Sequence, residues 1–272
     1  MNIRNGIVAA FSCLAGLLLV TPSTAAVINV PSSEAKTISE AMIKVRMGDT
    51  VLVAPGVYKE RVIMAPGVAL VSTSLFEAKI DGQGRGTVVT MSKNSSISGF
   101  EIRNGTIGIF SSDLGNEISQ NRIVHNWQTG IITVRHLPKI EDNVIAFNRS
   151  SGIQGWDVRS TSVSINHNSI AYNGNHGIAM GGSSEIIIEN NVIAFNERFG
   201  LKVLKDAEKV QVSSNNFYKN LWAPGKTLPE NNHSFDPAFI AARRGMNFKQ
   251  DPNRCCTAKS EEDENLGARL TY

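Results

Sequence analysis

The sequence predicts an all-β fold, a single-stranded right-handed parallel β-helix with a short capping helix at its N-terminal end. Two observations carry this prediction. A unit of 22 to 25 residues, rich in asparagine, glycine and isoleucine, recurs along the middle of the chain. An amphipathic segment precedes these repeats and has the composition of a short helix.

The repeating unit reads I-x-x-N-x-I-x-x-N-x-x-x-G-I. In each copy the second asparagine follows the first by five residues, and the glycine follows four residues later. Segments this short, alternating apolar and polar residues between Asn and Gly, are typical of strands joined by tight turns. The first asparagines are spaced by 22, 25 and 23 residues, at Asn121, Asn143, Asn168 and Asn191.

Such a unit cannot bury its apolar face alone, so the units must stack coil on coil. One asparagine per coil, at a turn, is then expected to adopt the left-handed conformation and to hydrogen-bond the coils on either side. We therefore interpret the asparagines as structural. Phe147, Tyr172 and Phe195 share one position of the repeat and predict a stacked aromatic column that His125 continues.

The ends of the repeat region differ from its middle, as expected where a coil end exposes unpaired strand edges. Residues 37–46 predict the helix that caps the first coil, and residues 48–60 predict a strand, a Pro-Gly turn and a second strand. The solenoid is expected to span residues 27–221. Residues 222–272 are expected to form a closing segment and an acidic tail.

Residues 1–26 predict a secretory signal peptide. Arg4 precedes an apolar stretch over residues 7–20, and small residues follow at 21–26. The stretch is too short to span a membrane, and no second candidate span follows. We therefore expect an exported protein, periplasmic or extracellular, without a membrane span after signal cleavage.

Composition excludes several classes of function. The formal net charge is only +3, and no block of Lys and Arg interleaves with aromatic residues, so nucleic-acid binding is not expected. No nucleophile elbow, P-loop, HExxH or CxxC motif occurs, and we predict neither a metal nor a cofactor. After processing only the adjacent Cys255 and Cys256 remain. They could close a strained ring, bridge two molecules or stay reduced.

The segment G-D-T-V-x-V-x-P-G-x-Y-x-E at residues 48–60, together with the asparagine repeats, resembles the right-handed parallel β-helix superfamily. This superfamily includes pectin methylesterases, pectate lyases and NosD-type periplasmic proteins. The resemblance covers roughly residues 27–250 and includes a closing D-P-x-F segment at 236–239. It implies the fold but not an activity, because the same solenoid hosts many unrelated reactions.

A candidate site emerges when the units are aligned on their glycines, because equivalent residues of successive coils then form columns. An arginine can grip a uronate carboxylate, a tryptophan can stack on a sugar ring, and two carboxylates can divide catalytic roles. Pectin methylesterases use Asp, Asp, Arg and Gln on this fold, as the resemblance implies. The predicted catalytic residues are Asp113, Arg135 and Asp157, and the predicted substrate-binding residues are Gln154, Trp156, His136, Lys202 and Lys205.

The alternative for the same column is a structural charge ladder that merely pairs adjacent coils. Three functions therefore stay open from the sequence. The first is binding or processing of an acidic polysaccharide, and the second is a non-catalytic envelope or surface scaffold. The third is a NosD-like periplasmic accessory protein for copper-enzyme maturation, which the sparse histidines disfavour. The oligomeric state is left open.

Overall fold

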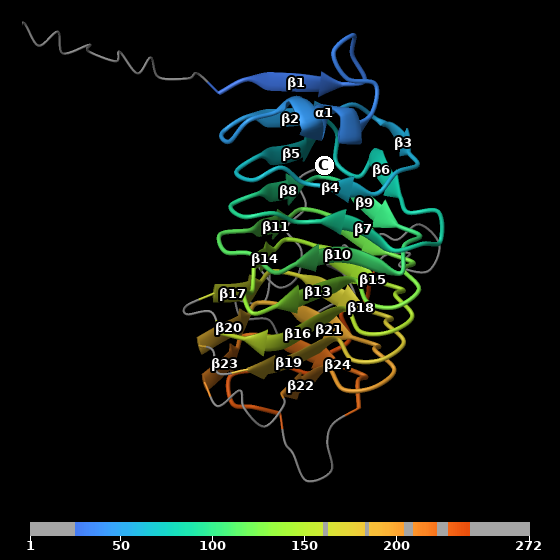
Figure 1. Ribbon diagram of the computed structural model, residues 1–272. Helices are drawn as coiled ribbons and strands as arrows, with labels where there is room; N and C mark the ends of the chain where they lie inside the picture. Colours follow the sequence, from blue (N-terminus) through green and yellow to red (C-terminus); the bar gives the residue numbers. More distant parts are fainter. Residues whose placement is uncertain (1–24, 160–162, 183–184, 204–208, 222–227, 240–272) are drawn as a thin grey trace, which may run out of the picture.

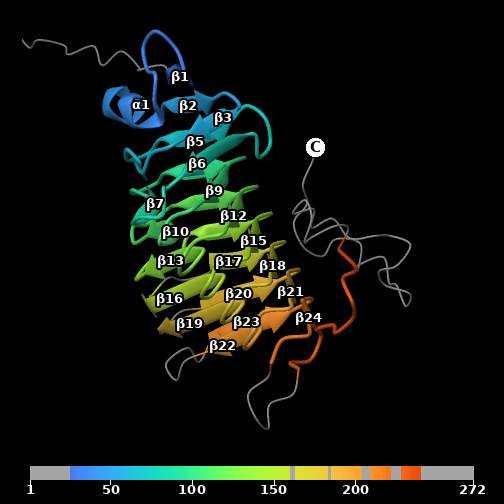
Figure 2. The ribbon, with the colours of Figure 1, turned by 90° about the vertical axis from the view of Figure 1, so that its right-hand side faces the viewer.

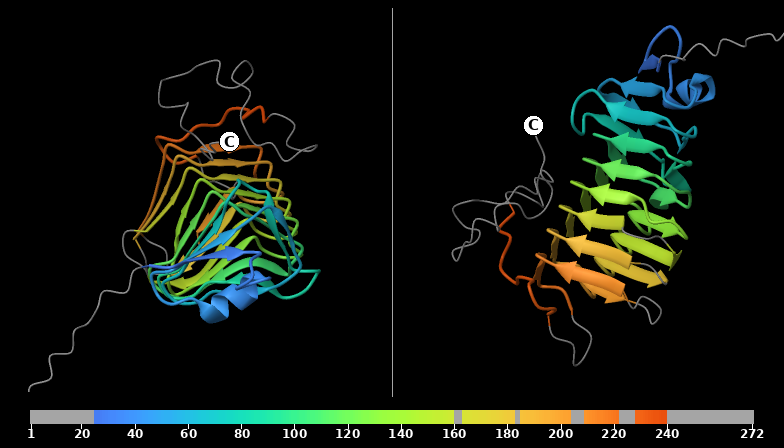
Figure 3. Two further views of the ribbon diagram at one scale, coloured as in Figure 1. Left: turned by 90° about the horizontal axis from the view of Figure 1, so that it is seen from above. Right: turned by 90° about the vertical axis from the view of Figure 1, so that its left-hand side faces the viewer.

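A computed structural model describes residues 25–159, 163–182, 185–203, 209–221 and 228–239. They form a right-handed parallel β-helix of about eight coils, stacked along one axis (Figure 1). The predicted fold class is confirmed. Seen from above, the sheets enclose one continuous interior (Figure 3). No helix among the described residues is long and apolar enough to cross a membrane.

Each interior coil gives one strand to each of three parallel sheets, which we call A, B and C. Sheet A contains β1 (Val27–Val30), β2 (Thr50–Val53), β5 (Ala69–Ser72), β8 (Ser96–Ser98), β11 (Glu117–Ser119), β14 (Lys139–Glu141), β17 (Val163–Asn166), β20 (Glu185–Glu189) and β23 (Lys209–Ser213). Sheet B contains β3 (Gly56–Tyr58), β6 (Ala78–Asp81), β9 (Glu101–Arg103), β12 (Arg122–Val124), β15 (Val144–Ala146), β18 (Ser169–Ala171), β21 (Val192–Ala194) and β24 (Asn216–Tyr218). Sheet C contains β4 (Val62–Ile63), β7 (Thr87–Thr90), β10 (Ile107–Ser111), β13 (Ile131–Val134), β16 (Ile153–Val158), β19 (Ile178–Gly182) and β22 (Leu201–Val203).

The isoleucines of the repeat build the core because each lies in register with its counterpart one coil away. In sheet B, for example, Ile123 pairs with Ile145, and Ile145 pairs with Ile170. All three are fully buried. Equivalent columns run through sheets A and C, so apolar burial and backbone pairing extend together along the axis.

The asparagines form two internal ladders at the turns on either side of sheet B. Asn168 Oδ1 accepts from the backbone N–H of Asn143 (3.0 Å), and Asn168 Nδ2 donates to the carbonyl of Ile140 (2.9 Å). The expectation that these asparagines take the left-handed conformation is wrong. The residue before each asparagine takes it, as at His167 (φ 53°). The asparagine side chain can then point inward and satisfy buried backbone groups.

The same geometry explains the aromatic column. His125, Phe147, Tyr172 and Phe195 are the left-handed residues before the second ladder, so their rings point outward at equivalent places. Successive ring centroids lie 5.4, 5.3 and 4.9 Å apart and the rings are stacked, which confirms the prediction.

The glycine of the repeat is required by close approach to the next coil. A Cβ on Gly130 would lie 2.8 Å from the carbonyl oxygen of Gly152 and 2.9 Å from Asn148 Nδ2. Any side chain there would collide with the ladder that stabilises the turn. The repeat therefore couples its asparagine and its glycine across neighbouring coils.

The N-terminal end is closed by α1 (Ile38–Lys44), which lies beside the first coils (Figure 2). Thr37 caps the helix by accepting from the N–H of Glu40 (3.1 Å). The Glu60 carboxylate accepts from the N–H groups of Ile38 (3.0 Å) and Ser39 (2.9 Å). The predicted capping helix is confirmed, and Glu60 ties it to the second coil.

Near the other end, Asn232 continues the first ladder by accepting from the N–H of Asn215 (3.0 Å). The predicted D-P-x-F segment follows, and Phe235 and Phe239 pack against the cluster formed by Val192 and Ala194 of sheet B. Several predictions fall outside the described residues: most of the signal peptide, Lys205, Cys255, Cys256 and the acidic tail.

Candidate functional site

The predicted site lies on the outer face of sheet C and on the loops that follow its strands. Trp156 pairs in register with Val134, and its carbonyl accepts from the N–H of Arg135 (3.1 Å). The Trp156 side chain is not in the core, because the residue is 47% exposed. Arg135 is exposed at the end of the neighbouring strand, so the two predicted residues do lie on adjacent coils.

The predicted carboxylates have a different arrangement from a simple alternating ladder. Asp157, in β16, accepts two hydrogen bonds from Arg159, the residue directly after that strand, at 3.0 and 2.8 Å. The Arg159 backbone N–H donates to the carbonyl of Arg135 (2.7 Å). Asp113 is exposed in the loop after β10. Among the described residues, Asp113 and Arg135 form no ion pair with each other, and neither do Arg135 and Asp157. The sequence reasoning missed Arg159.

Gln154 and Lys202 belong to a row of residues on sheet C that we call the outer ladder, in which every member is at least partly exposed except Ala179, which is buried. Gln154 also lies near Thr129, whose hydroxyl is 3.4 Å from its amide oxygen. The outer ladder comprises Ile63, Thr90, Phe110, Ile132, Gln154, Ala179 and Lys202, each paired in register with the next.

His136 lies in the loop after β13 and is only partly exposed. Its backbone is fixed, because its N–H donates to Val134 and its carbonyl accepts from the Thr133 hydroxyl (2.6 Å). The Nδ1 atom of its ring is buried without a hydrogen-bond partner among the described residues. His136 therefore lies next to the exposed Arg135 but faces partly inward.

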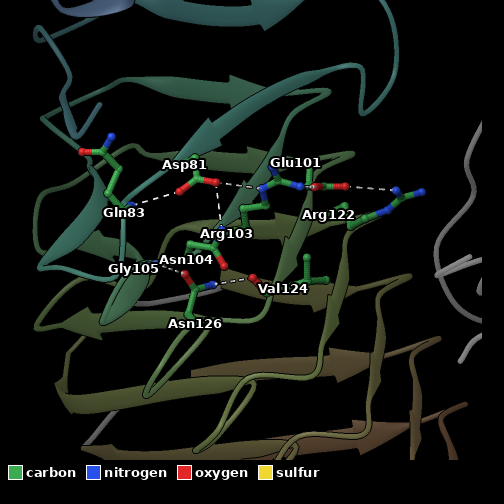
Figure 4. Close-up of polar contacts among 9 residues, drawn as sticks. All are labelled: Asp81, Gln83, Glu101, Arg103, Asn104, Gly105, Arg122, Val124 and Asn126. Carbon is green, nitrogen blue, oxygen red and sulfur yellow. Dashed lines mark hydrogen bonds and ion pairs between the residues drawn. The ribbon is translucent and has the colours of Figure 1, made fainter. Parts of the chain in front are cut away.

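A second charged cluster, which the sequence reasoning did not single out, lies on the outer face of sheet B (Figure 4). Glu101 bonds Arg103 (2.8 Å) and Arg122 (3.2 Å), and Arg103 also bonds Asp81 (3.2 Å). Burial alone would raise the pKa of Asp81, but hydrogen bonds from the Gln83 N–H and from neighbouring side chains hold that pKa below its usual range. These ion pairs join residues of β6, β9 and β12, so the cluster connects three successive coils.

The described residues offer little to a metal ion. No group of three or more His, Cys, Asp or Glu side chains gathers within the described ranges. His176 stacks on Phe199 at 5.3 Å and accepts from its backbone N–H at Nδ1 (3.2 Å). Burial, helped by nearby cationic side chains, lowers the pKa of His176 to about 4. Its ring is therefore neutral and structurally engaged.

Comparison with known protein families identifies the family of this chain. A family model described as "Periplasmic copper-binding protein (NosD)" matches residues 47–223. The chain belongs to the NosD family. The matched residues cover almost the whole β-helix, so NosD membership and the observed fold agree. The NosD family is described as periplasmic.

Several solved structures are similar to this NosD-family chain at low sequence identity. Pectate lyase Pel9A aligns with a TM-score of 0.53 and 16% identity, covering 92% of this chain and 90% of its own. A pectin methylesterase in complex with hexasaccharide VII covers 85% and 99% (11%, TM-score 0.39). Pectin methylesterase PemA from Erwinia chrysanthemi covers 85% and 99% (10%, TM-score 0.35). No curated protein matches the sequence significantly.

Proposed function

We propose that this NosD-family protein is exported and binds an extended acidic polysaccharide along the outer face of sheet C. The observation that carries the proposal is the half-exposed Trp156, which shares β16 with Gln154. Arg135 directly follows β13, the strand that pairs in register with β16. An exposed indole ring offers an apolar surface to one face of a sugar, and an arginine offers two parallel donors to a carboxylate.

The shape of the face favours a polymer over a small molecule. The outer ladder runs straight across seven strands, from Ile63 to Lys202. At ~4.8 Å between paired strands, the six steps extend over about 29 Å. A flat strip of this length suits a chain of repeated units better than a compact ligand, which needs an enclosing cavity.

The contacts of the carboxylates favour binding without turnover. Asp157 is held by Arg159, and its side chain is 54% exposed. Asp113 is exposed as well. Cleavage of glycosidic or ester bonds needs two carboxyl groups in different environments, so that one acts as an acid and the other as a nucleophile or base. Asp113 and Asp157 are both exposed to solvent and lack such different environments. We therefore assign Arg135, Gln154 and Trp156 to ligand binding, with Lys202 and His136 at the margins of the face.

The test is binding of the mature protein to oligogalacturonates of defined length, measured by calorimetry. We expect Arg135→Gln and Trp156→Ala each to weaken binding at least tenfold with unchanged thermal midpoints, since both side chains are exposed. Lys36→Gln, an exposed cation near α1, is the matched control and should bind like wild type. If the wild-type protein binds no acidic oligosaccharide, the proposal is wrong. Release of new reducing ends, or of methanol from a methyl-esterified oligomer, would instead make it an enzyme.

The family description favours a second candidate function, copper binding in the periplasm. The described residues do not supply a matching donor set, because no group of three or more His, Cys, Asp or Glu side chains gathers among them. The adjacent thiols Cys255 and Cys256 lie outside the described residues. Titration of the mature protein with Cu(I), repeated on the C255S/C256S variant, tests this candidate. Stoichiometric binding that the double substitution abolishes would establish it.

A further inference from the structure

A groove of about 530 Å³ opens at the start of sheet C, where the chain passes from sheet B into β4 and β7. It lies at the N-terminal end of the outer ladder, because Ile63 and Thr90 belong to both. Ile63 is 74% exposed. The groove is therefore open to solvent and continuous with the face assigned to ligand binding. Its lining also includes Lys59, Glu60, Arg61, Asp81, Gln83 and Thr87.

Arg61 is positioned in this groove by the next coil. A Cβ added to Gly86 would lie 2.7 Å from Arg61 Nη1, so the guanidinium packs directly over the bare Cα of that glycine. Gly86 has a φ of 55°, which favours glycine and keeps this space free. Arg61 forms no ion pair with any described residue. An oriented arginine without a counter-charge lines an open groove.

The two acids of the groove are already engaged. Both oxygens of Glu60 accept backbone N–H groups at the start of α1. Asp81 accepts from the Gln83 N–H (3.0 Å), from Asn104 (2.8 Å) and from an arginine of the next coil. Neither carboxylate is therefore directed at Arg61. The lining carries two cations and two carboxylates, but the carboxylates are held by these partners, whereas Lys59 and Arg61 form no ion pair with a described residue. Thr87 and Thr90 add hydroxyls to the lining, a combination that suits a carboxylate on a hydroxyl-rich ligand.

We propose that this groove is a second anion subsite, in which Arg61 binds the carboxylate of a uronate unit several sugars away from the unit on Trp156. The inference rests on the proposed function, since it places both subsites on one polysaccharide chain. Four ladder steps separate Ile63 from Gln154. At ~4.8 Å per step the subsites lie about 19 Å apart, so only a long oligomer can occupy both.

The experiment compares galacturonate dimers with oligomers long enough to span both subsites, using the mature wild-type protein, Arg61→Gln and Lys36→Gln. We expect Arg61→Gln to weaken the long oligomer about tenfold and to leave the dimer unchanged, because the dimer occupies the Trp156 subsite alone. Lys36→Gln should match wild type on both. Thermal midpoints should coincide, since Arg61 is exposed.

The outcomes separate this inference from the function on which it rests. Equal affinity of wild type and Arg61→Gln for the long oligomer, with binding still lost in Trp156→Ala, overturns the second subsite and keeps the proposed function. Equal losses for dimer and long oligomer in Arg61→Gln also overturn it, because Arg61 would then belong to a single short site. Failure of the wild-type protein to bind either ligand overturns both.

Discussion

Replacing Asn168 with leucine tests the ladder that sets the turns of this β-helix. Asn168 is fully buried, and its Nδ2 donates to the carbonyls of Ile140 and Asn166, both at 2.9 Å, and to Asn191 Oδ1 at 3.0 Å. Its Oδ1 accepts from the backbone N–H of Asn143 at 3.0 Å. Leucine has a similar size but can make none of these hydrogen bonds.

The size of the effect follows from the groups left behind. Three backbone groups lose an amide partner: the N–H of Asn143 and the carbonyls of Ile140 and Asn166. At roughly 1 kcal/mol for each of these three lost hydrogen bonds, the free energy of unfolding should fall by about 3 kcal/mol. Leucine regains little by burial, because it faces polar atoms of the turn on both sides.

Urea denaturation of the mature variant, followed by circular dichroism, measures this loss. Asn166→Leu is the matched control, since Asn166 is only partly buried and its side chain accepts one hydrogen bond, from Asn190 (3.2 Å). The control should lose about 0.5 kcal/mol. Equal denaturation midpoints for Asn168→Leu and wild type would refute the view that the ladder stabilises the coils.

Three further predictions concern stability. Glu101→Leu, which leaves two arginines without their shared carboxylate, should cost about 3 kcal/mol in urea denaturation, whereas Glu117→Gln, in an exposed pair, should cost under about 0.5 kcal/mol. His176 has a pKa of about 4 in the fold, below its usual 6.5, so its contribution to stability is present above about pH 6.5 and is lost as pH falls toward 4. His176→Gln should flatten this dependence, and parallel pH profiles would contradict the assignment. Gly130→Ala should lower the thermal midpoint by several degrees, because its Cβ meets the next coil, and an unchanged midpoint would argue against the close approach.

The fold was predictable because its determinants repeat. The fixed steps between Asn121, Asn126 and Gly130 recur in every complete unit, and each step corresponds to one turn or strand of the coil. The left-handed residue was misassigned because asparagine commonly adopts that conformation in isolated turns. Here the ladder needs the asparagine amide inside, so the preceding residue takes the left-handed backbone.

The site was only partly predictable. Counting from the glycines placed Arg135 and Asp157 at equivalent positions, and they do lie on neighbouring coils. The counting could not reveal Arg159, because its pairing with Asp157 depends on how the backbone turns at the end of β16. Arg61 and Gly86 escaped notice since the first coils lack the asparagine repeat, which leaves no register from which to align them.

The coupled asparagine and glycine give the coils that carry both residues matching upper and lower surfaces. One such coil can therefore stack on another without a new kind of interface, and duplication or loss of one unit changes the length of the molecule but not its cross-section. Among the described residues, α1 and the segment around Asn232 lie at the two ends of the stack and have no counterpart in the repeated coils. Gain or loss of repeat units during evolution would therefore change the length of the outer face in steps of about 4.8 Å.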